Sequence, residues 1–214
     1  MTNVNNVSIA CGAWPAEHGI SANSFYNKKE GKPEYMNSAE LIRSPTIFRR
    51  AAEQGIKSAL LTSKRKTLEL FHKDVEIGIA AEAATDEHIA KYGKPANIYS
   101  KEINYWLWQA AIDILKNRSD IGLVYVHITD YPMHAWGPHE PDSVEHLQTL
   151  DRLIGEAFEV APDAAFLATA DHGMNFKTRC WDLDKVLAKE GIPAQFVLSP
   201  ERDYYIVHHR NFTG

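Results

Sequence analysis

The chain has 214 residues, of which 44% are hydrophobic and 24% are charged, and this is the composition of an ordinary globular protein. Its net charge of −5 and the scatter of lysine and arginine along the sequence argue against nucleic acid as a partner. No stretch approaches the roughly 20 consecutive apolar residues of a membrane span, and the N-terminus lacks the pattern of a signal peptide, so we expect a cytoplasmic protein that has no membrane partner.

Helical and strand-like patterns alternate along the sequence. Ser44 and Pro45 are typical of a helix N-cap and first helical residue, and Gly55 is typical of a helix end. Short apolar runs between the helical stretches are typical of buried strands. The predicted elements, in chain order, are a helix over 46–55, a strand over 56–63, a helix over 66–73, a strand over 75–82, a helix over 101–117, a strand over 121–130, a helix over 143–158, a strand over 164–171, a helix over 181–191 and strands over 194–199 and 203–209.

This alternation predicts an α/β fold with a largely parallel sheet sandwiched between helices, in a single domain over residues 1–214. Such a sheet usually begins with a strand, whereas residues 1–19 read as a polar, turn-rich segment. We therefore expect that the sequence lacks an N-terminal strand of its sheet.

Two of the predicted helices carry an apolar face, which we expect to contact the core. Over 101–117 this face consists of Ile103, Trp106, Leu107, Ala110, Ile114 and Leu115. Over 143–158 it consists of Val144, Leu147, Leu150, Ile154 and Phe158. The two cysteines, Cys11 and Cys180, have neither the number nor the spacing of a disulfide framework, and we expect buried, reduced thiols.

Two pairs of metal-ligating side chains follow predicted strands. Asp130 ends the strand over 121–130, and His134 lies four residues later, on the same side of one helical turn. Asp171 ends the strand over 164–171, and His172 follows it at a turn that Gly173 eases. Because ligands gather at the carboxyl ends of strands in open α/β sheets, the two pairs should be neighbours and could hold two divalent metals.

A single Asp and His at a strand end is more often a cap or a surface turn. Two such pairs together favour a metal site, and their mixed carboxylate and imidazole donors suit zinc or a similar divalent ion. We place His139 and His146 on the solvent side of the following helix, without a ligand role.

Three stretches resemble the alkaline phosphatase superfamily, in its nucleotide pyrophosphatase/phosphodiesterase branch and most closely the phosphonoacetate hydrolases. They are TNVNNVSIACGAWPAEHGI at 2–20, TDYPMH at 129–134 and ATADHGM at 168–174. The resemblance implies an alkaline phosphatase-like fold and a threonine nucleophile, which is Thr2 here. It also implies two metal ions, both expected to be Zn²⁺. One would bind Thr2, Asp171 and His172, and the other would bind Asp130 and His134.

The resemblance extends to the substrate groups. TSKRKTLELF at 62–71 resembles the segment whose lysines receive the acid groups of the substrate, with Lys64 and Lys66 at the matching positions. Two solvated lysines at a helix start are the alternative, although the helix macrodipole disfavours cations there. By the same resemblance, Asn23 would donate to a phosphoryl oxygen.

The resemblance implies hydrolysis of the C–P bond of phosphonoacetate to acetate and phosphate. The alternatives are a phosphodiesterase or nucleotide pyrophosphatase of the same branch, acting on a phosphate ester, and a non-catalytic fragment. A sulfatase is disfavoured because the sequence around Cys11 lacks its nucleophile pattern. The expected partner is thus a small-molecule phosphonate or phosphate ester, and a homodimer is the oligomer to consider.

Two metal ligands of the family, an Asp upstream of the nucleophile and a His far downstream, have no counterpart in the sequence. We therefore expect a partial catalytic domain that lacks its N-terminal strand and its C-terminal part. Because each metal would lose one ligand, we expect little or no phosphonoacetate hydrolysis by the isolated chain.

Overall fold

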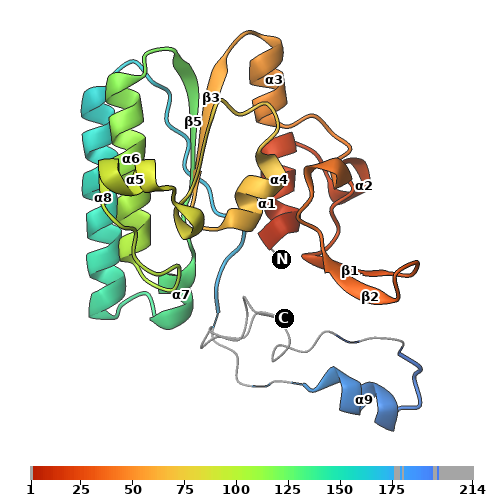
Figure 1. Cartoon of the computed structure of the whole chain (residues 1–214). Helices are drawn as coiled ribbons and strands as arrows, with labels where there is room; N and C mark the ends of the chain where they lie inside the picture. The colour runs from red at the N-terminus through yellow and green to blue at the C-terminus, as the bar shows by residue number, and fades with distance from the viewer. Residues whose placement is uncertain (1, 176–178, 180, 195–196, 198–214) are drawn as a thin grey trace.

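Three parallel strands form the central sheet of the protein, which we describe from a computed structural model (Figure 1). The structure describes residues 2–175, 179, 181–194 and 197. The strands β3 (Lys57–Thr62), β4 (Ile77–Ala80) and β5 (Ile121–His127) lie in the order β4-β3-β5. Helices cover both faces of this sheet, which confirms the predicted α/β fold.

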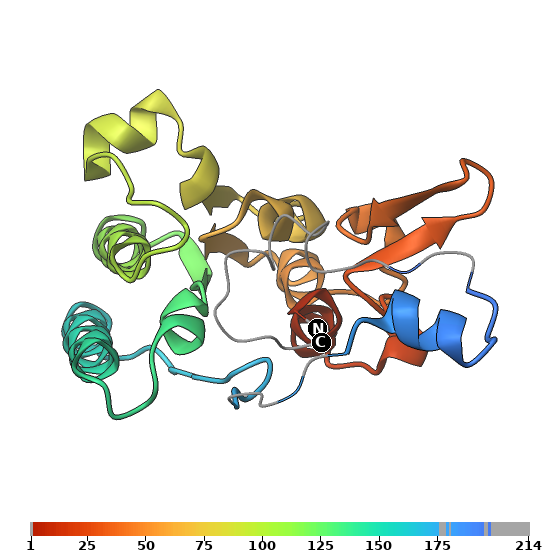
Figure 2. The same ribbon diagram turned by 90° about the horizontal axis from the view of Figure 1, so that it is seen from below.

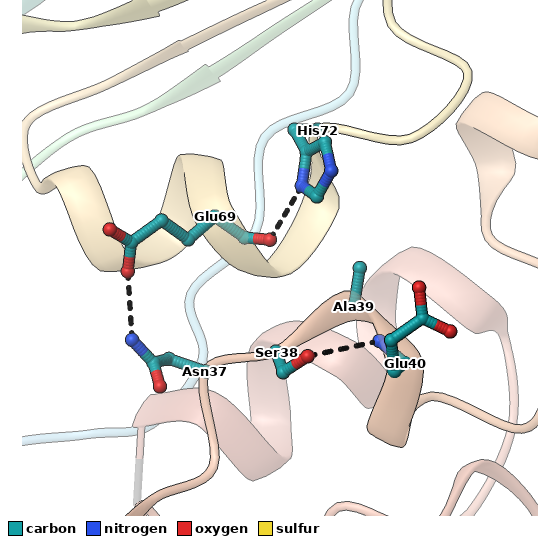
Figure 3. A pocket seen from close by; sticks show the side chains of 6 residues that line it. All are labelled: Asn37, Ser38, Ala39, Glu40, Glu69 and His72. Carbon is teal, nitrogen blue, oxygen red and sulfur yellow. Dashed lines mark hydrogen bonds between the residues drawn. The ribbon is translucent and has the colours of Figure 1, made fainter.

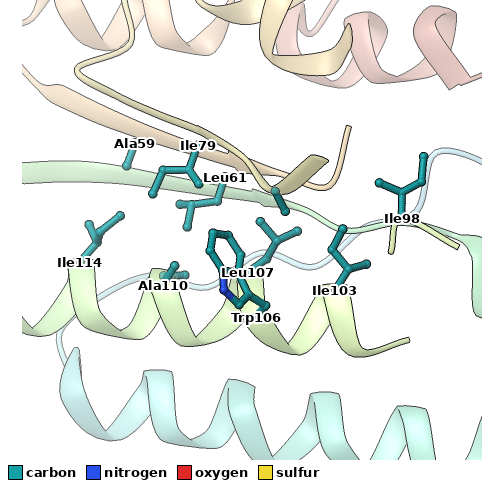
Figure 4. Close-up of a cluster of buried hydrophobic side chains, with 11 residues drawn as sticks. Ala59, Leu61, Ile79, Ile98, Ile103, Trp106, Leu107, Ala110 and Ile114 are labelled. Carbon is teal, nitrogen blue, oxygen red and sulfur yellow. The ribbon is translucent and has the colours of Figure 1, made fainter. Parts of the chain in front are cut away.

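Helix α6 (Glu102–Asn117) packs on one face of the sheet through the predicted apolar side chains except Leu115, which is half-buried outside this cluster. Figure 4 shows this cluster, in which Leu107 and Ala110 of the helix meet Ala59 and Leu61 of β3. Helix α8 (Pro141–Val160) lies beside α6 on the same side of the sheet, as Figures 1 and 2 show from two directions.

A second apolar cluster covers the other face. Helices α1 (Thr2–Cys11), α3 (Ile47–Glu53) and α4 (Arg65–Phe71) contribute to it and enclose Leu60 of β3. Its buried members are Val4, Val7, Ala10, Cys11, Ile20, Met36, Phe48, Leu60, Leu70 and Phe71.

The reading of residues 1–19 as a turn-rich segment is wrong, because most of this segment is helical in α1 and α2 (Pro15–His18). In α1, the apolar residues Val4, Val7, Ala10 and Cys11 follow one another at helical spacing, so they form one stripe that is buried against the sheet. Burial of this stripe outweighs the low helix propensity of the asparagines between them.

The remaining elements are short. They are the antiparallel hairpin of β1 (Ser24–Asn27) and β2 (Lys32–Tyr35), the 3-10 turns η1 (Ala39–Leu41) and η2 (Ala81–Ala83), and the helices α5 (Asp86–Tyr92), α7 (Tyr131–Ala135) and α9 (Leu183–Lys189). Of these, α9 lies in the helix predicted over 181–191, with Asp182 as its N-cap. No helix in the described part of the chain is long and apolar enough to cross a bilayer.

The predicted buried strand over 164–171 is not a strand. Its residues form an extended, unpaired segment, and the side chain of Leu167 is 92% exposed. Phe166 stacks on Phe158 of α8 with ring centroids 3.8 Å apart, instead of entering the sheet. An apolar run becomes a strand only where its backbone finds a partner, and β5 pairs only with β3 among the described residues.

The apolar face predicted for the helix over 143–158 is also wrong in part. Three of the predicted residues, Val144, Leu147 and Phe158, are exposed. The buried face of α8 is a second row of residues next to the predicted one. The buried residues of α8 are Ser143, His146, Leu150, Leu153 and Ala157. His146, which we expected on the solvent side, is therefore buried, whereas His139 is exposed as expected.

Helix α3 begins later than predicted. Its N-cap is Thr46 instead of the predicted Ser44. Thr46 Oγ1 accepts a hydrogen bond from the Arg49 N–H at 3.2 Å. Cys11 is buried, as expected, and Cys180 lies outside the described residues. The strands predicted over 194–199 and 203–209 also lie outside them, apart from Ala194 and Val197.

Candidate active site

The segment after β5 brings Asp130 to the edge of the sheet where the strands end. Asn104 of α6 fixes this segment, because its Nδ2 donates to the Thr129 carbonyl at 2.9 Å and its Oδ1 accepts from the Thr129 N–H at 2.8 Å. Asn104 and Thr129 are both buried. Asp130 then takes the N-cap position of α7, so its carboxylate is held at the end of the sheet.

The two predicted ligand pairs lie together. Nε2 of the buried His134 lies 3.1 Å from Asp130 Oδ2 across one turn of α7. Nε2 of His172 lies 3.5 Å from Asp171 Oδ2 and 4.0 Å from Asp130 Oδ2. The Asp130 carboxylate is therefore the common neighbour of both histidines, although the segment that carries Asp171 is not a strand.

Helix α1 carries Thr2 to the same edge of the sheet, where Figure 1 also shows α7. Asn5, three residues after Thr2, donates from Nδ2 to the Asp171 carbonyl at 2.8 Å. Asn23 lies at the start of α1, because its Oδ1 accepts from the Asn3 N–H at 2.9 Å. A donor role of Asn23 toward a substrate would fall to its Nδ2, which is the donor of the side-chain amide.

Lys64 and Lys66 are both buried, with exposed fractions of 6% and 7%. Lys64 takes the N-cap position of α4, and its Nζ lies 3.6 Å from Asp130 Oδ1. The alternative of two solvated lysines is therefore wrong. Burying a charged ammonium group is costly unless it has a specific partner, and for Lys64 this partner is Asp130.

His127 is a site residue that the sequence analysis did not select. It is the last residue of β5, and its ring contacts Asn6 of α1 and Thr62 of β3. Burial lowers the pKa of His127 to about 4, with Lys64 as the next cause. Its signal in the sequence is a histidine inside an apolar strand, next to the loop that carries Asp130.

The spacing of each Asp–His pair fits two ligands of one metal ion. Two donors on a tetrahedral ion at 2.0–2.1 Å lie about 3.3 Å apart, and the two pairs measure 3.1 Å and 3.5 Å. Among the described residues, no set of three or more His, Cys, Asp and Glu side chains is arranged to hold a metal. Each pair thus supplies two ligands, and a hydroxyl such as that of Thr2 would have to add another.

The cavity in Figure 3 is separate from these residues. It has a volume of about 290 Å³ and lies between η1 and α4, where Glu40, Glu69 and His72 line it. None of the predicted site residues lines it, and its acidic groups are already engaged: Glu69 accepts from Asn37 at 2.8 Å, and Glu40 pairs with Lys73 at 2.6 Å. We assign it no role in the chemistry.

Comparison with known proteins shows which family this chain is similar to. The family model described as type I phosphodiesterase / nucleotide pyrophosphatase matches residues 1–211. A venom phosphodiesterase of Naja atra is 25% identical over 185 residues, which cover 81% of this chain and 21% of that protein. A pyrophosphatase/phosphodiesterase of Schizosaccharomyces pombe is 24% identical over 180 residues, or 81% of this chain and 36% of that protein.

The structure is similar to that of phosphonoacetate hydrolase from Sinorhizobium meliloti 1021. In complex with phosphonoacetate, that protein matches with a TM-score of 0.79 and 28% identity, over 90% of this chain and 51% of its own. In complex with phosphonoformate, it matches with a TM-score of 0.78 and 29% identity, over 88% of this chain and 50% of its own. The chain thus has the fold of this enzyme and spans about half of its length.

Proposed function

Because this chain belongs to the type I phosphodiesterase / nucleotide pyrophosphatase family of hydrolases, we propose that it cleaves the C–P bond of phosphonoacetate to give acetate and phosphate. The observation that carries the proposal is the burial of both Lys64 and Lys66, with Lys64 Nζ 3.6 Å from Asp130 Oδ1. Two buried ammonium groups, one beside Asp130 and the other close enough to His127 to affect its pKa, suit a substrate that carries a carboxylate as well as a phosphonate. The structural similarity to a phosphonoacetate hydrolase supports the same substrate.

The Asp–His pairs are the metal-binding part of the proposal. Members of the family are generally metal-dependent. Asp130 and His134 would hold one divalent ion, and Asp171 and His172, with Thr2, would hold the other; zinc is the ion we propose. Such ions lower the pKa of a bound hydroxyl and neutralise the charge on phosphoryl oxygens.

The chain's own groups then have the following roles. The Thr2 hydroxyl gives up its proton to water as its oxygen forms a bond to phosphorus and the C–P bond breaks. The electron pair of that bond leaves with the acetate carbon, which takes a proton from water. Asn23 Nδ2 donates to a phosphoryl oxygen. Lys64 and Lys66 stabilise the negative charge that spreads into the acetate carboxylate. Water hydrolyses the phosphothreonine and releases phosphate.

A phosphodiesterase or pyrophosphatase is the second candidate. The match to the family model and the venom phosphodiesterase relatives favour it. It would use Thr2 and the Asp–His pairs in the same way, but a diester has no carboxylate for both lysines to bind. A non-catalytic fragment is the third candidate.

One experiment separates the three. Phosphate release from phosphonoacetate and nitrophenol release from bis(4-nitrophenyl) phosphate are measured with zinc, on the natural protein as its gene encodes it. We expect turnover of phosphonoacetate that Thr2→Ala abolishes and that Lys64→Gln lowers at least ten-fold.

The matched control is Lys57→Gln, because Lys57 is exposed and pairs with Glu76 and Asp120. Faster turnover of the diester, unaffected by Lys64→Gln, supports the second candidate, and no turnover of either supports the third.

Three further expectations belong to this proposal. They are a single catalytic domain over residues 1–214, a cytoplasmic location, and a small-molecule phosphonate or phosphate ester as the partner. Sedimentation would test whether the protein is a homodimer.

A further inference from the structure

The imidazole of His127 joins three elements beside the candidate site. Its Nε2 lies 3.0 Å from Asn6 Nδ2 of α1, and its Nδ1 lies 3.1 Å from Thr62 Oγ1 at the end of β3. The main-chain carbonyl of His127 also accepts a hydrogen bond from the Ser63 N–H at 3.1 Å. One side chain therefore connects α1, β3 and β5 at the edge of the sheet where the strands end.

These contacts lead in two directions to the proposed reactive groups. In α1, Asn6 lies four residues after Thr2, on the same face of the helix. At the end of β3, Thr62 Oγ1 also accepts from the Lys64 N–H at 3.3 Å, and Lys64 Nζ reaches Asp130. The ring thus lies between the helix of the proposed nucleophile and the turn of the proposed substrate lysine.

The hydrogen bonds require a neutral ring. As its side chain is oriented, Asn6 offers only N–H groups to Nε2, so Nε2 accepts, and Nδ1 carries the proton toward Thr62. An imidazolium would place two N–H donors face to face at Asn6.

The surroundings keep the ring neutral at pH 7. Burial is the largest cause that lowers the pKa of His127, and the positive charges of Lys64 and Lys66 add to it. The Asp130 carboxylate acts in the opposite direction and raises this pKa, and the contacts from α1 and β3, Asn6 and Thr62, are uncharged.

We propose that His127 is a positioning residue that fixes α1, and therefore Thr2, relative to the Lys64 turn. The reactive roles of Thr2 and Lys64 rest on the proposed function, but the positioning of α1 does not. An experiment that follows the backbone of α1 can therefore test the inference by itself.

The test compares amide hydrogen exchange in α1 and in α6. His127→Leu removes both side-chain contacts, and His127→Gln keeps a donor and an acceptor. The control is His146→Leu, because His146 is a buried histidine whose ring contacts the Tyr105 hydroxyl at 3.1 Å between α8 and α6, away from α1. We expect His127→Leu to raise exchange in α1 about ten-fold relative to α6, His127→Gln to raise it less, and His146→Leu to leave the ratio unchanged.

An unchanged ratio in His127→Leu, or an equal rise in His146→Leu, would overturn the inference. Turnover of phosphonoacetate is the second measurement, made below the melting temperature of each variant. We expect His127→Leu to lower kcat about ten-fold with little change in KM, and His146→Leu to lower neither. A wild-type protein without turnover would contradict the proposed function, while the exchange ratio would still decide the role of His127.

Discussion

His127 links the stability of the protein to pH. Its pKa is about 4 in the folded protein, against 6.5 for an ordinary histidine. Above pH 6.5 the ring is neutral in both states. As the pH falls from 6.5 to 4, the unfolded chain binds a proton that the folded chain does not, so the free energy of unfolding falls by up to roughly 3 kcal/mol.

Urea denaturation at a series of pH values between 7.5 and 4.5 measures this effect. The control is His127→Gln, in which the part of the slope due to this ring should vanish. Burial also lowers the pKa of His18 and of His146, so these rings contribute to the slope in both proteins and cancel in the difference. Equal slopes in the two proteins would show that His127 titrates normally.

Thr46 is the N-cap of α3, and Ser44 is the matched control two residues away. Thr46→Ala removes the acceptor of the Arg49 N–H, so we expect the free energy of unfolding to fall by about 1 kcal/mol. Ser44→Ala should change it by less than about 0.5 kcal/mol, as is usual for a residue outside a cap or core. Thermal and urea unfolding check both values, and a larger effect at Ser44 would restore the cap predicted from the sequence.

At the scale of single residues, the sequence marks the candidate site residues more clearly than the residues that support them. Asp130 and His134 are recognisable because metal-ligating side chains at a strand end have few other reasons to occur together. His127 and Asn6 escape notice because their role depends on contact between residues 121 positions apart. No local pattern marks such a pair.

At the scale of elements, the corrected face of α8 gives a direct test. Leu153 is buried against α6, and Leu147 on the same helix is 53% exposed. We expect Leu153→Ala to lower the free energy of unfolding by about 2–4 kcal/mol through lost burial and a cavity. Leu147→Ala should lower it by less than about 1 kcal/mol. Urea denaturation of the two variants decides between the faces, and the reverse order would support the face predicted from the sequence.

The two long helices show what periodicity can and cannot predict. The face of α6 is predicted correctly because it has one apolar stripe. Helix α8 has two neighbouring stripes, one through Leu150 and Leu153 and the other through Val144 and Leu147, and only the position of α6 decides which is buried. The error over 164–171 has a related cause, because a strand depends on a backbone partner that its own sequence does not specify.

At the scale of the whole molecule, metal binding should stabilise the fold. A ligand that binds only the folded state adds about 2.7 kcal/mol at a free concentration 100 times its Kd. We therefore expect zinc to raise the melting temperature, and chelation to reverse the rise. Asp130→Asn should reduce the rise because this carboxylate neighbours both histidines. The control is His139→Gln, in an exposed position after α7, and equal shifts in both variants would contradict the assignment of Asp130.

The contacts of α1 have a consequence for the order in which the protein folds. Asn6 and Asn5 of the first helix bond to His127 and Asp171, which are 121 and 166 positions further along the chain. During synthesis α1 leaves the ribosome long before either partner exists, and closing such long loops costs entropy that local contacts avoid. The core around β3 and β4 can form first, so the candidate site is the last part to assemble. In refolding kinetics, Asn6→Ala should therefore speed unfolding and leave the folding rate nearly unchanged, with a φ-value near zero.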